Sequence, residues 1–223
     1  DLHQQQLRAA DQIRFLRAQG AQNLSRVLDI GASSGHFLKA LQQEFQADGV
    51  GVEPGNAYRA LAEAQGLHML PSLPELIASQ PKRFDLVSLM HVLEHLPDPV
   101  GVLRQVREEL LTPQGWLLLE VPNFYAHNSY ELAHLSCFTP HTIVEALSKA
   151  GYEIINLRQH GYPRSKLFKL YLNVLAQPSA NPPEDYQVKP EHAVPLKRSL
   201  AIAWRDLRAR LDPKRSWLPV EEK

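Results

Sequence analysis

Apolar residues along this chain occur in two patterns, short unbroken runs and wider helical spacings. The short runs, which indicate buried strands, cover residues 26–30, 49–53, 67–70, 84–90, 115–121, 152–159 and 167–176. Helical spacing covers residues 2–18, 37–45, 58–65, 99–111 and 139–151. Strands that alternate with helices predict a doubly wound, mostly parallel α/β sheet with helices on both faces. No helix separates the last two strands, so we expect this seven-stranded sheet to have an antiparallel last strand.

The pattern changes near residue 177. Residues 1–177 contain all the predicted strands and form one domain, which begins with an N-terminal helix at 1–20. Residues 178–223 read as a Pro-rich linker and an amphipathic helix. The apolar stripe of that helix consists of Leu196, Leu200, Trp204, Leu207 and Leu211. We expect the helix to dock on its own domain or on a second copy in a homodimer. Arg205 and Arg208 lie beside the stripe, so weak contact with a membrane surface is the alternative.

The composition excludes several classes of protein. Of the 223 residues, 44% are apolar and 22% are charged, which is typical of a folded domain rather than a disordered chain. The 24 basic and 24 acidic residues cancel, which argues against a nucleic-acid-binding protein. No apolar run reaches the ~18 residues of a transmembrane helix, so we expect a cytoplasmic protein. Residue 1 is Asp rather than Met, so we expect the chain to be processed, trimmed or cut from a longer one, in which an upstream module could deliver the substrate.

The loop at residues 29–35 (Asp-Ile-Gly-Ala-Ser-Ser-Gly) joins the first predicted strand to a helix. Glycine lets a ligand approach the backbone, and the helix N-terminus offers unpaired N–H groups. Glu53 lies at the tip of the next strand, 22 residues after Gly31, where a carboxylate can accept hydrogen bonds from two ribose hydroxyls. The two features together predict a nucleoside-containing cofactor.

Over residues 20–177 the chain resembles the class I S-adenosylmethionine-dependent methyltransferases. The matching segments are residues 27–37, 52–54, 84–99 and 110–123. Two departures stand out: Ser33 replaces the middle glycine of the usual first motif, and residues 71–73 lack the Asp that often faces the adenine amino group. The resemblance implies a Rossmann-like fold and S-adenosylmethionine as the cofactor, with S-adenosylhomocysteine as the product.

The resemblance also implies where the cofactor lies. Its methionine part would cover the Gly31 loop, its ribose would meet Glu53, and its reactive methyl would lie near Met90 and His91. Backbone groups around residues 72–73 would contact the adenine. The implied cofactor-binding residues are Asp29, Gly31, Ala32, Ser33, Gly35, Phe37, Glu53, Pro54, Ser72, Leu73, Met90 and His91.

Histidine is the usual base for deprotonating a hydroxyl acceptor, because its pKa lies near neutral pH. We rank the candidates His134, then His95, then His91. His91 and His95 are four residues apart, so we expect them to share one helical turn. His134 lies in residues 124–138, where members of the family build a lid over the acceptor. In that lid Tyr125, Tyr130 and Phe138 either line the acceptor or pack the loop.

A divalent metal ion is the less favoured alternative. His91, Glu94, His95 and His134 could converge as ligands. A few methyltransferases of similar layout bind a metal through a Glu-x-x-Glu-His set, but His91 stands where the first Glu would be. We therefore assign no metal ligands.

The sequence thus predicts transfer of a methyl group from S-adenosylmethionine to a small molecule or a glycan or lipid intermediate. Oxygen is the expected acceptor atom, attacking the sulfonium methyl in line. Two alternatives remain: a non-catalytic methyltransferase-like binding module, and an NAD-dependent oxidoreductase. The second is disfavoured because its phosphate loop reads G-x-G-x-x-G, whereas Gly31 and Gly35 here are spaced G-x-x-x-G.

Overall fold

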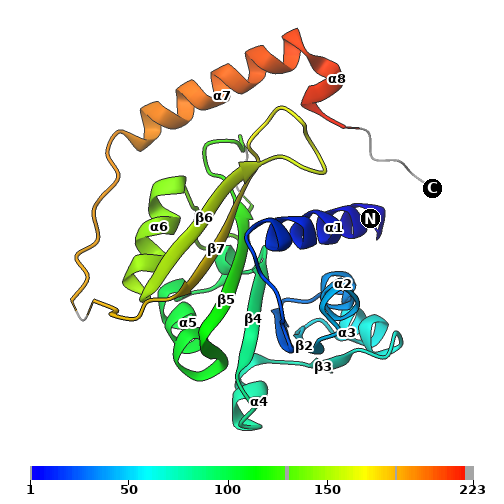
Figure 1. Ribbon diagram of the computed structural model, residues 1–223. Coiled ribbons are helices and arrows are strands. Elements are labelled where there is room, and N and C mark those ends of the chain that lie inside the picture. The colour runs from blue at the N-terminus through cyan, green and yellow to red at the C-terminus, as the bar shows by residue number, and fades with distance from the viewer. Residues whose placement is uncertain (1, 129–130, 184, 219–223) are drawn as a thin grey trace.

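The computed structural model describes residues 2–128, 131–183 and 185–218 (Figure 1). Its strands are β1 (Arg26–Ile30), β2 (Asp48–Val52), β3 (His68–Leu70), β4 (Phe84–Met90), β5 (Leu111–Pro122), β6 (Tyr152–His160) and β7 (Tyr171–Pro178). Its helices are α1 (Leu2–Ala18), α2 (His36–Phe45), α3 (Asn56–Glu63), α4 (Leu73–Ala78), α5 (Pro99–Gln105), α6 (Pro140–Lys149), α7 (Val194–Leu211) and α8 (Pro213–Ser216). A 3₁₀ turn, η1 (Leu93–His95), and a π-helical turn, η2 (Val106–Leu110), complete the elements.

The seven strands form one sheet in the order β3-β2-β1-β4-β5-β7-β6. Strands β1 to β5 pair in parallel, and β7 runs antiparallel to both of its neighbours, β5 and β6. The predicted Rossmann-like, doubly wound sheet with an antiparallel last strand is therefore confirmed. Strand order reverses between β1 and β4, and the carboxyl ends of parallel strands at such a switch point form the usual ligand crevice.

Both faces of the sheet are buried, because successive side chains of a strand point to opposite faces. In β1, Leu28 joins the core under α4, α5 and α6, whereas Val27 joins the core under α1, α2 and α3. The helices on the two faces can be followed in Figure 1. This two-sided burial explains why the central strands read as continuous apolar runs.

Three local predictions need correction. The chain forms α4 directly after β3, where no helix was expected; Ser72 caps it by accepting a hydrogen bond from the Glu75 N–H. The apolar run at 167–176 is strand only from Tyr171 onward. His91 and His95 do not share a helical turn, because η1 begins at Leu93 and His91 adopts a left-handed backbone (φ 56°).

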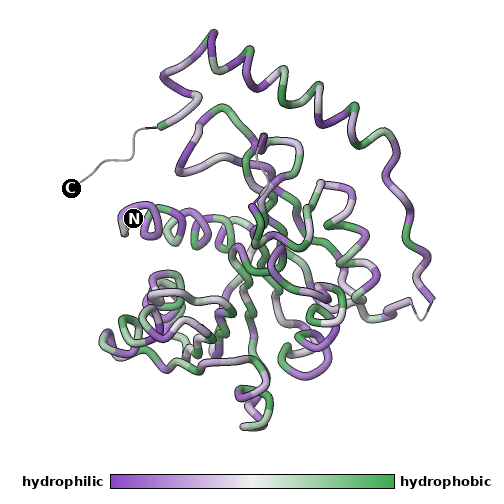
Figure 2. Tube along the Cα trace, turned by 180° about the vertical axis from the view of Figure 1, so that it is seen from behind, coloured by the Kyte–Doolittle hydropathy of each residue, from purple (hydrophilic) through white to green (hydrophobic). Residues whose placement is uncertain are grey.

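The C-terminal helix was expected to dock on its own domain or on a second copy. It contacts its own domain through Arg198 and Arg205, but its apolar stripe is not buried there. The five stripe side chains are 46–72% exposed. Instead α7 runs along the outer edge of the molecule and carries hydrophobic and hydrophilic positions side by side (Figure 2). Within the described residues, no helix is both long and apolar enough to cross a membrane.

Candidate active site

The loop after β1 lines a cavity of about 190 Å³ beside α1. Gly31 has φ +75°, a left-handed conformation that favours glycine. A Cβ at this position would lie 2.2 Å from Cγ2 of Val92, so the loop needs glycine to pass this close to the end of β4. Seven of the twelve predicted cofactor residues line the cavity, namely Asp29, Gly31, Ala32, Ser33, Phe37, Met90 and His91.

The other five predicted cofactor residues lie outside the lining of this cavity; they are Gly35, Glu53, Pro54, Ser72 and Leu73. The Glu53 carboxylate accepts hydrogen bonds from the N–H groups of Ser33 (2.9 Å) and Gly55 (2.7 Å). Glu53 therefore ties the first loop to the tip of β2, which is where the ribose was expected. Gly35 faces Leu67, whose Cδ1 would lie 2.2 Å from a Cβ at residue 35. All twelve assignments remain predictions.

Asp29 lies under the loop with its side chain enclosed. Burial raises the pKa of its carboxyl to about 7, the hydroxyl of Ser88 opposes this by donating a hydrogen bond (2.7 Å), and the nearby Glu53 carboxylate raises the pKa further. A carboxyl poised in this way ionises readily when a cation binds beside it. The sulfonium or ammonium group of a cofactor would be such a cation.

Helix α1 supplies one wall of the cavity through Gln5, Arg8 and Gln12. The guanidinium of Arg8 also donates to the hydroxyl of Tyr171 on β7 (2.8 Å). Sequence reasoning predicted the helix but assigned it no functional residue. Arg8 could not be singled out from the sequence, because its role depends on the fold placing α1 beside the loop after β1.

A buried carboxylate, Glu120 on β5, forms the floor of the same cavity. It accepts hydrogen bonds from Gln12 (2.6 Å) and pairs with the rings of His91 and His160, both at 3.0 Å. Burial alone would raise its pKa, but the hydrogen bonds and charges of the two histidines drive the pKa far below its usual range. Glu120 was missed, although a lone acidic residue inside an apolar strand is a readable signal.

His91 is held by two carboxylates. Its Nε2 pairs with Glu120 at 3.0 Å, and its Nδ1 lies 3.4 Å from Oε1 of Glu94. Burial lowers the pKa of the imidazole, but the interactions with Glu120 and Glu94 outweigh it and the net shift is upward. Because both ring nitrogens face carboxylates, neither is directed at an acceptor, and this geometry argues against the base role predicted for His91.

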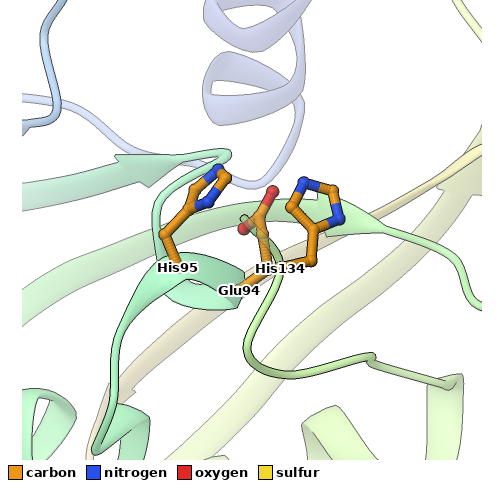
Figure 3. Close-up of side chains that lie close together, drawn as sticks. All are labelled: Glu94, His95 and His134. Atoms are coloured by element: carbon orange, nitrogen blue, oxygen red, sulfur yellow. The ribbon is translucent and has the colours of Figure 1, made fainter. Parts of the chain in front are cut away.

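The side chains of His95 and His134, the other two predicted bases, lie close to Glu94 (Figure 3). Their rings contact edge to face, with centroids 4.8 Å apart. Nδ1 of His95 lies 2.9 Å from the carbonyl oxygen of Ala133, which can only accept, so Nδ1 carries the proton and Nε2 is left as an acceptor. His134 lies within 3.3 Å of Glu131.

Glu94, His95 and His134 also form a group that could hold a metal ion. One ligand atom from each lies within 4.8 Å of the other two. Glu94 is 1% exposed, and neither carboxylate oxygen has a hydrogen-bond partner in the described part of the chain. A second cavity of about 70 Å³ lies over Glu94 and His134. His91 borders the first cavity and Glu94 the second, so this pair separates the two.

The lid residues have mixed environments. Phe138 is buried in the core with α6, so it packs the fold. The hydroxyl of Tyr125 donates to Glu191 of the C-terminal segment (2.6 Å) and its side chain borders a third cavity. Tyr130 lies outside the described residues. The proposed acceptor wall therefore rests on other side chains, among them Phe124 and His127 of the second cavity.

Comparisons with known proteins agree with this architecture. A family model described as a methyltransferase domain matches residues 2–157. A ubiquinone biosynthesis O-methyltransferase of Leptothrix cholodnii is 35% identical over 109 residues, 44% of this chain and 44% of that protein. A similar enzyme of Xanthomonas campestris is 30% identical over 128 residues, 54% of this chain and 53% of that protein. The chain spans about half the length of the curated relatives it matches.

Solved structures share the fold. A SAM-dependent methyltransferase from Archaeoglobus fulgidus superposes with a TM-score of 0.62 at 20% identity, covering 78% of this chain and 94% of that one. The architecture and the glycine loop define a class I S-adenosylmethionine-dependent methyltransferase. Because the family model matches more than half of the chain, the protein belongs to this family of methyltransferase domains. The oxidoreductase alternative is thereby set aside.

Proposed function

We propose that this enzyme methylates a hydroxyl oxygen of a small molecule or a glycan or lipid intermediate. The observation that carries the proposal is the shared wall between the two cavities. On one side His91 borders the cofactor cavity, and on the other Glu94 and His134 border a second cavity with candidate bases. The names of the matched relatives, ubiquinone biosynthesis O-methyltransferases, support oxygen as the acceptor atom.

In this proposal the methionine part of S-adenosylmethionine lies in the first cavity. Asp29 would face its positive charge, and Arg8 its carboxylate. Glu53 retains free lone pairs beside its two backbone hydrogen bonds and would accept the ribose hydroxyls. His91, held by Glu120, would position the segment after β4 rather than take a proton.

The acceptor would enter the second cavity, where Nε2 of His95 or a nitrogen of His134 takes the hydroxyl proton. A cavity of about 70 Å³ is smaller than the ~300 Å³ of typical ligand sites, so side chains of residues 124–138 would have to move to admit an aromatic acceptor. Removal of the proton makes the oxygen a better nucleophile for the sulfonium methyl. The main contribution of the protein is to hold the two partners in line.

The direct test is a product screen with isotope-labelled S-adenosylmethionine against phenols, catechols, glycans and lipid-linked phenols, read by mass spectrometry. We expect a labelled O-methyl product. For the best acceptor, His134→Ala or His95→Ala should lower kcat by about 10²–10⁴-fold with unchanged affinity for S-adenosylhomocysteine. His68→Ala, an exposed histidine on β3, is the control. Products methylated only on nitrogen or carbon would contradict the proposal.

A second candidate is metal-assisted O-methylation, favoured by the buried carboxylate of Glu94, which contacts His91 at 3.4 Å but accepts no hydrogen bond from the described residues. Glu94, His95 and His134 would hold a divalent ion, which when bound would lower the pKa of an acceptor hydroxyl as a Lewis acid. Under this candidate the two histidines are ligands and take no proton.

Titration calorimetry with Mn²⁺, Zn²⁺ and Mg²⁺ separates the two candidates. Under the metal candidate, wild type binds one ion and Glu94→Gln loses that affinity, while Glu131→Gln, also beside His134, retains it. Under the base candidate, chelator treatment leaves kcat unchanged and no ion binds.

A further inference from the structure

Helix α7 faces the molecule with its arginines and faces outward with the four leucines of its apolar stripe, while Trp204 at the edge of the stripe also borders the cavity beneath the helix. At 100° per residue, the five stripe residues fall within an arc of about 80°. Arg198, Arg205 and Ala209 occupy the opposite side. The guanidinium groups of Arg198 and Arg205 donate to the carbonyl oxygens of His127 (2.7 Å) and Ala126 (2.8 Å). Charged side chains thus fasten the helix to the lid loop, which reverses the usual arrangement of an amphipathic surface helix.

The rest of the described protein does not cover the leucines of the stripe. A cavity of about 470 Å³ lies between α7 and the loops at residues 123–126 and 167–169. Leu196, Leu200 and Leu211 are each more than 60% exposed, and among the described residues they join no apolar cluster. Such a continuous apolar strip on a water-facing helix marks an interaction surface.

The positive charge of α7 and α8 indicates which kind of surface the apolar stripe would bind. Helix α7 carries five basic residues and one acidic residue, and α8 adds Lys214 and Arg215. Lys197 and Arg210 lie at the two margins of the stripe, and the guanidinium of Arg208 lies 5.7 Å from the ring centre of Trp204. Leucines flanked by basic side chains, with a Trp at the boundary, are the features of a helix that lies in the surface of an anionic bilayer.

A second copy of the chain fits less well. Two α7 helices packed stripe to stripe would bring two strongly basic surfaces together, and like charges repel. The stripe contains five large side chains, whereas a standard protein interface uses about 20–30 residues a side. A bilayer needs only one buried apolar face and supplies the opposite charge.

We propose that the outer face of α7 binds the surface of an anionic lipid bilayer. The leucine stripe lies among the acyl chains, and the flanking basic side chains meet lipid phosphates. Because α7 is fastened to residues 126 and 127 of the lid, this orientation holds the acceptor side of the enzyme at the membrane. The inference does not depend on which atom is methylated.

Vesicle flotation with the full chain tests the proposal. We expect binding to vesicles of phosphatidylcholine mixed with phosphatidylglycerol, little binding to pure phosphatidylcholine, and weaker binding as salt rises. Leu200→Glu and Ser199→Glu form a matched pair: both sites are exposed neighbours and gain the same charge, but only residue 200 lies on the stripe. Ser199→Glu should lower partitioning by about fivefold at most, and Leu200→Glu by about fiftyfold or more, since it also loses leucine burial.

Leu207→Ser, which adds no charge, should also weaken binding by several-fold. Circular dichroism and S-adenosylhomocysteine titration check that each variant is folded. No binding to anionic vesicles at low salt would overturn the proposal. So would equal losses in Leu200→Glu and Ser199→Glu, or a concentration-dependent dimer that Leu200→Glu dissociates.

Discussion

Asp29 and Glu120 are both buried carboxyl groups at one cavity, yet their neighbours move their pKa values in opposite directions. Asp29 has only the Ser88 hydroxyl to offset the cost of burial, and its pKa rises to about 7. Glu120 has two histidines and the Gln12 amide, and its pKa falls. The neighbours of Glu120 thus favour its ionised form at the first cavity, whereas the carboxyl of Asp29 gains and loses its proton near neutral pH.

The raised pKa of Asp29 predicts a pH-dependent difference in stability. The unfolded carboxyl titrates near 3.8 and the folded one near 7, so the folded state holds the proton more tightly, and this contribution to stability is lost as pH rises through that window. Wild type should lose roughly 2–3 kcal/mol relative to Asp29→Asn between about pH 5 and about pH 7.5. Urea unfolding at both pH values measures this. Equal pH dependence of the two proteins would show that Asp29 titrates normally.

Removing the charge of Glu120 should destabilise the fold. Glu120→Gln leaves His91 and His160 without their shared counter-charge in a buried site, and breaking a buried ion pair costs about 3–5 kcal/mol. The free energy of unfolding from urea titrations is the measurement. Glu153→Gln, an exposed site on the adjoining part of the sheet, should change it by less than about 0.5 kcal/mol. A similar small change for both variants would mean that the Glu120 pairs contribute little.

Individual helices and strands differ in how well their local sequences predict their structure and role. Most strands and α6 follow their apolar patterns, and Thr139 caps α6 just before Pro140, its first residue. In contrast α4 is one and a half turns held by a serine cap, too short for a periodic signal. Helix α1 was predicted as a helix, but its contribution of Arg8 to the cofactor cavity depends on where the sheet places it.

Helix α1 should therefore contribute to cofactor recognition through Arg8. Arg8→Ala should weaken S-adenosylhomocysteine binding by about 10–100-fold, because a hydrogen bond to a charged group contributes about 1.5–3 kcal/mol. Binding of 5′-methylthioadenosine, which lacks the amino-acid part, should not change. Arg14→Ala, on the exposed side of the same helix, is the control in calorimetric titrations. Equal loss for both ligands would assign Arg8 a structural role only.

At the scale of the whole molecule, segments distant in sequence converge on residues 120–139. Helix α1 reaches Glu120 from residue 12, and the C-terminal segment reaches Tyr125 and Thr139 from Glu191. Helix α7 holds the carbonyls of residues 126 and 127. The N-terminal helix thus holds the end of β5, and the C-terminal segment holds residues 125–127, so ligand binding beside them should stabilise the entire fold.

Thermal unfolding tests this linkage. At about 100 times its Kd, S-adenosylhomocysteine should stabilise the folded state by about 2.7 kcal/mol, which for a domain of this size raises Tm by about 5–10 °C. NAD should produce no shift. Glu53→Ala should reduce the shift, with Glu63→Ala on the exposed side of α3 as the control. A full shift in Glu53→Ala would remove Glu53 from the cofactor site.

The sequence by itself determined the strand and helix order, the glycine loop after β1 and the three candidate histidines. These are local properties: apolar period, chain reversal at glycine and side-chain chemistry are set within a few residues. Only the tertiary structure decided that His91 borders the first cavity and His134 the second. It also assigned Glu120 and Arg8 to the site and turned the stripe of α7 outward. Each of these depends on contacts between segments up to 160 residues apart, such as Gln12 with Asn173, and no local pattern encodes which partner a polar or amphipathic face will meet.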